Sequence, residues 1–365
     1  MDKPLIIAYY LPQYHPIPEN DEWWGKGFTE WTNVAKAKPL FKGHYQPKIP
    51  ADLGFYDLRV PEVREQQAEL AREAGVDGFC YWHYWFGEGK ELLERPFKEV
   101  LKSGKPNFPF CLGWANESWE AKIWNSDGVK SKKILIEQTY PDDEDIEKHF
   151  YSLLDAFKDP RYMRISGCPI FHIYQPLNHP DVRHFIDKWN KLICKENVAE
   201  RFYFVAGAND SNYAEMKSLG FDAAIINLSG RMEKPYKNKN IIFRAFHYFF
   251  RLTLRKALTV SYKESLDYLW NDKVDSQEFV IPTLLPNWDH SPRSGNSFSI
   301  LTDCTPALFK ELCLRVLNGV KSKENKIIFV KSWNEWGEGN YMEPDLKYGK
   351  GYINSLASAK KEIYP

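Results

Sequence analysis

Two glutamates near the C-terminus have the type and spacing needed for acid–base chemistry at a glycosidic bond. Glu335 and Glu338 are three positions apart in the segment Trp333-Asn-Glu-Trp-Gly-Glu338. If this segment forms a helical turn, the two Cβ atoms lie roughly 5–6 Å apart on one side of it. Glycosyl transfer or hydrolysis with retained configuration uses carboxyl groups roughly 5–5.5 Å apart, whereas inversion uses roughly 6.5–9.5 Å. The spacing therefore predicts a retaining pair.

The surroundings of the pair decide its interpretation, because two glutamates three positions apart are common on helix surfaces. Trp333 and Trp336 flank the glutamates and lower the local polarity, and Gly337 and Gly339 permit a tight turn. Two carboxyl groups in such a setting also oppose each other's ionisation, which separates their pKa values. The segment follows the last of eight apolar runs along the chain. This setting favours a catalytic role.

The eight apolar runs alternate with amphipathic segments of helical periodicity. Nearly all residues in each run are apolar, as expected for parallel strands that are buried on both faces. The runs are Leu5–Tyr10, Gly78–Trp85, Phe110–Trp114, Ile170–Tyr174, Phe202–Ala206, Ala223–Leu228, Phe279–Leu285 and Ile327–Val330. The pattern predicts an α/β fold, the (β/α)8 TIM barrel, as a single domain over residues 1–365. A doubly wound sheet is the alternative, but no glycine-rich phosphate turn follows any run.

The helices between these runs are marked by ordinary start and stop signals. Pro61 begins one of them and Gly75 ends it. The predicted helices are Pro61–Ala74, Glu91–Lys102, Glu144–Phe157, Pro180–Lys195, Tyr213–Leu219, Tyr262–Trp270, Ala307–Leu317 and Tyr352–Ile363. Two segments are interpreted as insertions, Pro16–Pro50 after the first strand and Gly230–Leu258 after the sixth.

Polar and aromatic residues gather where the predicted strands end, which is where a TIM barrel carries its active site. Most of the 13 Trp residues lie there, and their flat faces suit stacking on sugar rings. Asn116 and Glu117 follow the third strand, and Asp289 and Arg293 follow the seventh. For each of these pairs, a buried salt bridge or a helix cap is the alternative to a role in sugar binding. The predicted substrate-binding residues are Tyr10, Gln13, His15, Trp82, His83, Trp114, Asn116, Glu117, Tyr174, Asp289, Arg293, Asn334 and Trp336.

Other kinds of chemistry find little support. Histidines follow four of the strands, but no HxxxH or HxH spacing joins them, so neither a metal nor another cofactor is predicted. There is no GxSxG segment, and none of the six cysteines begins a helix that would activate it. A formal net charge of zero gives no reason to expect a nucleic-acid partner.

The location of the chain is predicted from its cysteines and its apolar segments. The cysteines are scattered and fit free thiols of a reducing compartment. The first apolar run is too short for a signal peptide, and no stretch approaches the roughly 20 apolar residues of a membrane span. These features predict a cytoplasmic protein.

One segment nevertheless suggests contact with a membrane surface. Residues 231–256 contain eight Lys or Arg and a single acidic residue, Glu233. Within the segment, Phe243–Leu254 mixes bulky apolar residues with arginine. Such a segment predicts peripheral binding to an anionic membrane face. The alternative is a helical hairpin packed over the barrel with its charges in water.

Several of these segments together resemble the WbsX-like proteins. They are Tyr9-Tyr-Leu-Pro-Gln-Tyr-His15, Trp24-Gly-Lys-Gly-Phe-Thr-Glu-Trp-Thr-Asn33, Gly78-Phe-Cys-Tyr-Trp-His-Tyr-Trp85, Trp114-Ala-Asn-Glu117 and Trp333-Asn-Glu-Trp-Gly-Glu-Gly339. The resemblance runs from Tyr9 to about Pro344. That family is assigned to glycosyl transfer in O-antigen and capsule synthesis, and it is similar to glycoside hydrolase family 99, the endo-α-mannosidases and endo-mannanases.

The resemblance implies a TIM barrel without a catalytic metal and assigns roles to the two glutamates. In family 99 a Glu-Trp-His-Glu segment supplies both carboxylates, and the 2-hydroxyl of the substrate is the nucleophile, through a 1,2-anhydro sugar. By that analogy Glu335 deprotonates the 2-hydroxyl and Glu338 protonates the leaving oxygen. Gly337 stands where family 99 has the histidine, so the sugar subsite is expected to differ there.

The resemblance favours a glycosyltransferase of surface polysaccharide (lipopolysaccharide or capsule) synthesis acting on an oligosaccharide, with lipid-linked glycans as candidate substrates. A hydrolase similar to the endo-α-mannosidases is the first alternative, since it would use the same carboxylates. No DxD segment in a suitable setting supports a nucleotide-sugar donor. A non-catalytic sugar-binding barrel is the second alternative.

Overall fold

In the computed structural model, which describes residues 3–124, 130–254 and 256–365, the chain forms a closed parallel barrel. The seventh strand is interrupted at Pro282. Its first half pairs with the sixth strand and its second half with the eighth, so the sheet closes on itself. Within the described residues the barrel therefore has eight strands, and the predicted TIM barrel is confirmed. They are β1 (Leu5–Tyr10), β2 (Gly78–Trp85), β4 (Phe110–Trp114), β8 (Cys168–Ile173), β9 (Tyr203–Ala208), β10 (Ala223–Ile226), the split strand β12 (Val280–Ile281) and β13 (Thr283–Leu284), and β15 (Ile327–Val330).

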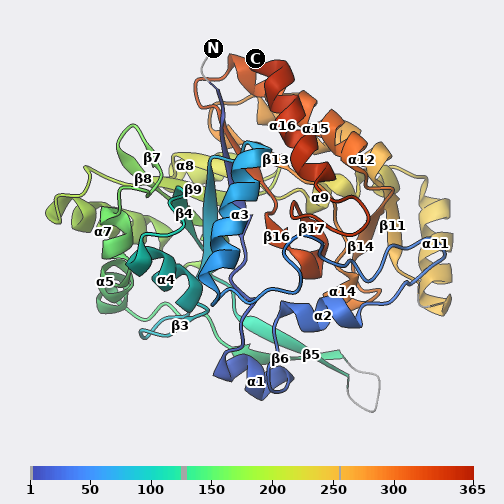
Figure 1. Cartoon of the computed structure of the whole chain (residues 1–365), viewed down its shortest axis with the longest axis horizontal. Helices are drawn as coiled ribbons and strands as arrows, with labels where there is room; N and C mark the ends of the chain where they lie inside the picture. The colour runs from blue at the N-terminus through green and yellow to red at the C-terminus, as the bar shows by residue number, and fades with distance from the viewer. Residues whose placement is uncertain (1–2, 125–129, 255) are drawn as a thin grey trace.

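Helices cover the outside of the barrel (Figure 1). α3 begins at Pro61 and ends before Gly75, whose left-handed φ of 79° terminates it as the sequence predicts. The last helix packs against α3 and α15, so the C-terminus closes the ring beside the N-terminal strands. The covering helices are α3 (Pro61–Ala74), α4 (Arg95–Ser103), α5 (Asp143–Ser152), α6 (Leu154–Lys158), α7 (Val182–Lys195), α8 (Tyr213–Ser218), α12 (Tyr262–Leu269), α13 (Asp272–Asp275), α15 (Pro306–Gly319) and α16 (Gly351–Ile363).

Two segments differ from the sequence prediction. Glu91–Leu92, expected to start a helix, instead forms β3, which pairs antiparallel with the end of β2. Leu93 has a φ of 58°, which no helix accommodates, and α4 begins only at Arg95, with Pro96 in its first turn. After β4 the chain forms a hairpin of β5 (Trp119–Trp124) and β6 (Lys130–Ile136), which the sequence did not indicate. The short β7 (Arg164–Ile165) also pairs with β8.

The predicted insertions supply most of the structure around the carboxyl end of the barrel. The first contains α1 (Pro18–Trp24) and α2 (Glu30–Lys36), and the second contains α9 (Ser229–Met232), α10 (Lys234–Lys237) and α11 (Ile241–Leu254). β11 (Leu258–Ser261) follows and pairs with β14 (Ser299–Thr302). α2 and the short helix α14 (Ser291–Ser294) both pack against the turn that follows β15. This turn carries both candidate catalytic glutamates.

The described residues contain no helix that is both long and apolar enough to cross a bilayer. Among them, all six cysteines are unpaired thiols, three of them buried.

We expect Gly207→Ala to lower the free energy of unfolding by about 1–3 kcal/mol, the usual cost of overpacking. A Cβ atom at Gly207, in β9, would overlap the backbone carbonyl oxygen of Tyr174 at the end of β8. Backbone at the barrel rim cannot move aside as a flexible side chain does. Urea denaturation measures the effect, and Gly230→Ala is the matched control because a Cβ there meets no atom within 4 Å. Equal stability of both variants would contradict this packing of β8 against β9.

Candidate active site

The two glutamates lie in a tight turn that the end of β1 holds in place. β15 leads into β16 (Asn334–Glu335), the 3-10 turn η3 (Trp336–Glu338) and β17 (Asn340–Tyr341), which pairs antiparallel with β16. Asn334 is fully buried, and its side chain accepts from the N–H of Leu11 at 2.7 Å and donates to the Leu11 carbonyl at 3.0 Å. The turn is therefore fixed to the carboxyl end of the first strand.

Glu338 is surrounded by groups that favour its ionised form. Its Oε1 lies 2.6 Å from Nη1 of Arg293 and 3.6 Å from Nε2 of His290, and its Oε2 accepts from Nδ2 of Asn340 at 3.2 Å. Burial opposes ionisation, but Arg293, His290 and the nearby Lys331 outweigh it and hold the pKa of Glu338 well below its usual value. Glu338 is therefore a carboxylate at neutral pH.

Glu335 has the opposite protonation state. Its side chain is buried, and burial together with the neighbouring Glu338 carboxylate raises the pKa of Glu335 to about 8, although Arg293 and Lys331 partly oppose this. Glu338 also interacts with Glu335 as a hydrogen-bond partner, so the two carboxyl groups are close together. At neutral pH one site thus holds a protonated and an ionised carboxyl group side by side.

Arg293 joins the pair to a third carboxylate, that of Glu30 at the start of α2. Nε and Nη2 of Arg293 bind the two Glu30 oxygens at 2.9 and 3.1 Å, and Glu30 is only 1% exposed. Gly337 lies against this ion pair, because a Cβ atom there would overlap Glu30 Oε1 and lie 2.9 Å from Arg293 Nε. The Glu30–Arg293 ion pair thus occupies the space that a histidine side chain at position 337 would need.

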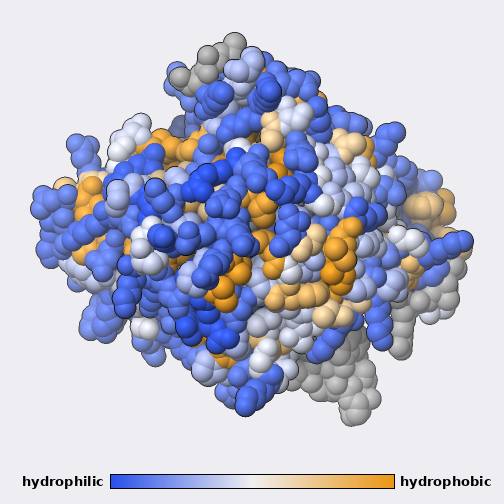
Figure 2. All heavy atoms as spheres, in the orientation of Figure 1, coloured by the Kyte–Doolittle hydropathy of each residue, from blue (hydrophilic) through white to orange (hydrophobic). Residues whose placement is uncertain are grey.

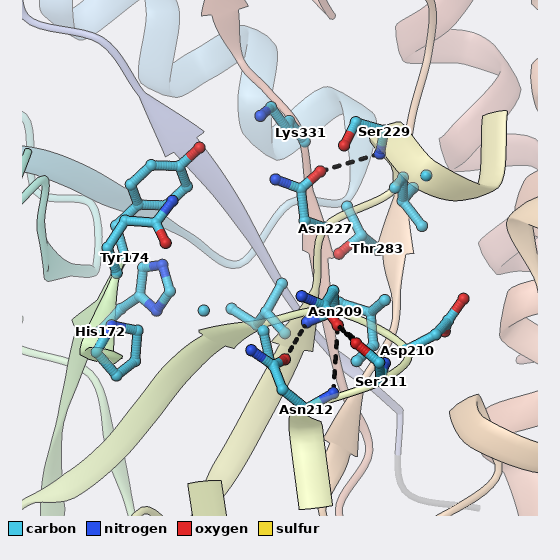
Figure 3. A pocket seen from close by; sticks show the side chains of 18 of the residues that line it. His172, Tyr174, Asn209, Asp210, Ser211, Asn212, Asn227, Ser229, Thr283 and Lys331 are labelled. Carbon is cyan, nitrogen blue, oxygen red and sulfur yellow. Dashed lines mark hydrogen bonds between the residues drawn. The ribbon is translucent and has the colours of Figure 1, made fainter. Parts of the chain in front are cut away.

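A cavity of about 430 Å³ opens at the carboxyl ends of β8, β9 and β10. Figure 3 shows His172 and Tyr174 on one wall and Asn227, Thr283 and Lys331 across from them. This volume is within the usual range for ligand sites. The lining combines aromatic rings with amides and hydroxyls, which are the groups that contact the faces and edges of sugar rings.

Lys331 and Tyr174 connect the cavity to the carboxyl pair. The half-buried Lys331 lines the cavity, and its pKa is raised because Tyr174, Glu338 and Glu335 outweigh the cost of removing its ammonium group from water. Tyr9 and Trp82 stack at the cavity floor with ring centroids 4.6 Å apart, and Trp82 meets Tyr174 edge-on at 5.4 Å. Neither Glu335 nor Glu338 is among the lining residues, so the cavity is linked to the pair through Lys331, whose charge acts on both glutamates.

The structure brings only part of the predicted binding set to this region. Trp82 and Tyr174 line the cavity, and Arg293 binds Glu338. Glu117 is exposed and lies close enough to Lys331 and Glu338 for their charges to act on it.

A second group of predicted residues faces the outer layer or another element. The Tyr10 hydroxyl donates to Gln67 of α3, Nε2 of His83 lies 2.9 Å from Nε2 of His149 on α5, and Trp114 Nε1 donates to the Trp85 carbonyl. His15 is 2% exposed, with Nδ1 at 3.0 Å from the Pro12 carbonyl oxygen. Their side chains pack between the barrel and its surroundings, because successive residues of a strand point to opposite faces.

The remaining predicted residues support the site from outside. Asn116 accepts from the N–H of Gln175 and donates to its carbonyl, both at 2.8 Å, which fixes the loop after β8. Asn334 fixes β1, and Trp336 donates to Glu343 at 2.7 Å. Asp289 accepts from Gln46 and lies 2.8 Å from His44 Nε2, on the far side of Gly339. Gln13 is half-buried, and its carbonyl accepts from the N–H of Glu30.

Several residues of the site were not among the predicted binding residues. They include Tyr9, Glu30, His172, Asn227, Thr283, His290, Lys331 and Asn340. Lys331 directly follows the last apolar run, which is a position that marks active-site residues in a TIM barrel. Glu30 has no such signal, since 263 positions separate it from Arg293. The described residues contain no cluster of three or more His, Cys, Asp or Glu side chains that would hold a metal ion.

The chain belongs to the WbsX glycosyltransferase family, whose model matches residues 6–356. It is 34% identical over 365 residues to the uncharacterized protein WxcX of Xanthomonas campestris pv. campestris, covering 97% of this chain and 49% of that protein. WxcX of a second strain is 33% identical, with the same coverage. The chain thus spans about half the length of the curated relatives it matches.

Solved structures share the fold at low sequence identity. A glycoside hydrolase-like protein superposes with a TM-score of 0.60 at 14% identity, covering 98% of this chain and 94% of that one. The GH99 endo-alpha-mannosidase from Bacteroides thetaiotaomicron superposes with a TM-score of 0.58 at 14% identity, covering 98% and 97%.

We expect Gly337→Ala to displace the Glu30 carboxylate and to weaken the Arg293–Glu338 ion pair. The pKa of Glu338 should then rise toward its usual value, which NMR titration of labelled carboxyl carbons measures. The double variant Glu30→Ala/Gly337→Ala is the control, because it removes the atoms that overlap the new Cβ. If Gly337→Ala leaves the titration of Glu338 unchanged, the described contact of Gly337 with the Glu30–Arg293 ion pair is contradicted.

We expect Glu335→Gln to raise the free energy of unfolding at pH 8 by about 1–3 kcal/mol, with a smaller gain at pH 5. The folded pKa of about 8 exceeds the ordinary 4.5, so between these values unfolding releases a proton from Glu335 and is favoured as pH rises. Glutamine removes this penalty. Glu338→Gln is the matched control and should destabilise the fold at pH 8, because Glu338 is ionised and paired. Thermal unfolding of the wild type and of both variants at the two pH values measures whether stability rises for Glu335→Gln and falls for Glu338→Gln.

Proposed function

We propose that this protein transfers glycosyl groups with retained configuration in the synthesis of a surface polysaccharide, and that Glu335 and Glu338 carry the chemistry. The observation that supports this most is the carboxyl pair with divided protonation, whose neighbouring cation Lys331 lines an aromatic, polar cavity. Environments that push two neighbouring carboxyl groups apart in pKa are typical of acid–base catalysts. Membership of the WbsX glycosyltransferase family supports transfer as the reaction.

The protonation states favour roles opposite to those implied by the resemblance to family 99. Glu335 holds a proton up to about pH 8 and is suited to protonate the leaving oxygen. Glu338 is an anion, and while Oε1 binds Arg293, Oε2 accepts only the weaker bond from Asn340. We therefore assign the base to Glu338, with Oε2 as the atom that accepts the proton of the substrate 2-hydroxyl.

The proposed reaction proceeds in two balanced steps. In the first, the 2-oxygen attacks C1 as Glu338 takes its proton, while Glu335 gives its proton to the departing oxygen. A 1,2-anhydro sugar remains, with Glu335 now ionised and Glu338 protonated. In the second, Glu335 takes the proton of the acceptor hydroxyl, which attacks C1, and Glu338 returns its proton to the 2-oxygen. The double inversion retains the configuration.

The cations around the pair stabilise the charge that moves during these steps. Arg293 and Lys331 act on both glutamates. Because one carboxyl group gains a proton as the other loses one, the net charge that these cations face stays nearly constant. Such fixed charges in a buried site need no reorganisation during the reaction. Lys331 also lines the cavity, so its ammonium group can contact a bound hydroxyl or acidic group.

Hydrolysis is the second candidate, because water in place of the acceptor hydroxyl completes the same second step. The likeness in fold to glycoside hydrolases makes this alternative concrete. A purely sugar-binding barrel is less well supported, because burying an ionised carboxylate beside a protonated one costs stability and adds nothing to binding alone.

The roles can be separated by the leaving group. We expect Glu335→Gln to lower kcat/KM by about 10²–10⁴-fold for a lipid-linked oligosaccharide cleaved between two sugars, because the departing sugar oxygen needs an acid. For aryl α-mannosides kcat/KM should change little, because the aryl group departs unaided in the first step. Glu338→Gln should lose activity on both, and the exposed Glu311→Gln is the matched control. Mass spectrometry identifies transfer or hydrolysis products. If Glu335→Gln alone loses activity on aryl glycosides, the acid and base roles of the two glutamates are reversed. If both variants keep full activity, neither glutamate is catalytic.

The pH dependence gives an independent check. We expect kcat/KM of the wild type to fall as pH rises through about 8, because Glu335 then loses the proton it must donate. The acid limb should lie below pH 4.5, since the pKa of Glu338 is lowered from that value. With aryl glycosides and Glu335→Gln the alkaline limb should disappear. An alkaline limb that persists in this variant would assign it to another group.

A further inference from the structure

Helix α11 presents apolar side chains to solvent. Its first nine residues include five large apolar side chains that are at least 59% exposed: Ile241 73%, Ile242 79%, Phe246 69%, Tyr248 59% and Phe249 69%. Figure 1 shows α11 at the right-hand edge of the molecule, outside the barrel, and Figure 2 shows apolar residues at the surface in that region. Surface helices of water-soluble proteins usually turn such residues inward.

Two polar side chains of α11 lie on its inner side. Arg244 is half-buried, and its Nη1 donates to the Lys237 carbonyl at 3.1 Å. His247 is also half-buried, and its ring packs on Tyr236 of α10 with centroids 5.4 Å apart. The helix is thus inverted with respect to an ordinary amphipathic surface helix. Its outward face is stable only if an apolar phase covers it.

The charge around α11 indicates what covers it. From Lys234 to Lys263 the sequence contains eight Lys or Arg and no Asp or Glu. Two of these cations are bound by carboxylates outside that range, Lys234 by Asp210 at 3.7 Å and Lys237 by Glu233 at 2.9 Å. Lys239 and Lys256 are exposed. Arg255, which belongs to the basic segment identified from the sequence, lies outside the described residues.

We propose that α11 docks into the interface of an anionic lipid bilayer, with its apolar face among the acyl chains and the cations that flank it at the headgroups. Aromatic and aliphatic residues beside lysine and arginine are the composition that binds such an interface. At 14 residues α11 is too short to cross the bilayer, so it lies in the plane of the surface. A second copy of this chain is a less suitable partner for this face, because its own basic segment would repel the cations around α11.

This docking would bring the cavity close to the lipid surface. α9 begins in the cavity wall, where Ser229, Gly230 and Lys234 of the second insertion are lining residues. The same short insertion then continues into α11. A glycan attached to a membrane lipid would therefore reach the cavity without leaving the surface. This last step rests on the proposed function, whereas the binding of lipid does not.

The test measures co-sedimentation of the full chain with vesicles, so it requires no turnover. We expect binding to vesicles of 30% phosphatidylglycerol in phosphatidylcholine, and at least tenfold weaker binding to phosphatidylcholine alone, since each cation near an anionic surface adds about fivefold. Ile242→Asp/Phe249→Asp should abolish binding. Ile134→Asp is the matched control, because Ile134 is 52% exposed on β6, away from α11 in the sequence. This variant should bind vesicles as the wild type does.

Three results would overturn the proposal. One is no binding of the wild type to anionic vesicles. Another is unchanged binding of Ile242→Asp/Phe249→Asp. The third is a wild-type dimer in light scattering that this variant converts to a monomer, which would assign the face to a second copy. Circular dichroism of the variant verifies that it folds. Vesicle binding without glycosyl transfer would sustain this inference while refuting the proposed function.

Discussion

The arrangement of the site depends on one guanidinium group held between two carboxylates. Arg293 binds Glu30 through Nε and Nη2 and Glu338 through Nη1. Removing either carboxylate would leave a buried charge without its partner, which is costly in a protein interior. Because Arg293 stabilises Glu338 as an anion, the proton of the catalytic pair resides on Glu335. The division of labour between two chemically identical side chains thus follows from the position of one cation.

The barrel provides the frame in which this cation and these carboxylates meet. The glutamates follow the eighth strand, Arg293 lies in α14 after the seventh, and Glu30 begins α2 in the insertion after the first. These elements are distant in sequence but adjacent at the rim, because the barrel brings the ends of its first, seventh and eighth strands together. The bonds from Asn334 to Leu11 then fix the catalytic turn to the first strand.

The sequence was sufficient for the strands, but not for the direction of side chains. Apolar runs predict buried parallel strands because nearly every position in them is buried, as in β15. They do not show that Tyr10 faces α3 while Tyr9 faces the cavity, since both residues are aromatic and adjacent. The Glu30–Arg293 ion pair is equally invisible in sequence, because loop geometry determines it. The inverted face of α11 shows in composition only as a mixture of apolar and basic residues.

The close contact at Gly337 constrains how such a site can change in evolution. Any side chain at this position requires the Glu30 carboxylate to withdraw, and Arg293 then lacks one of its two partners. A chain with histidine at the equivalent place must therefore arrange its first insertion differently. Positions 30, 293 and 337 are expected to vary together among relatives, so that their joint pattern distinguishes subgroups of the family.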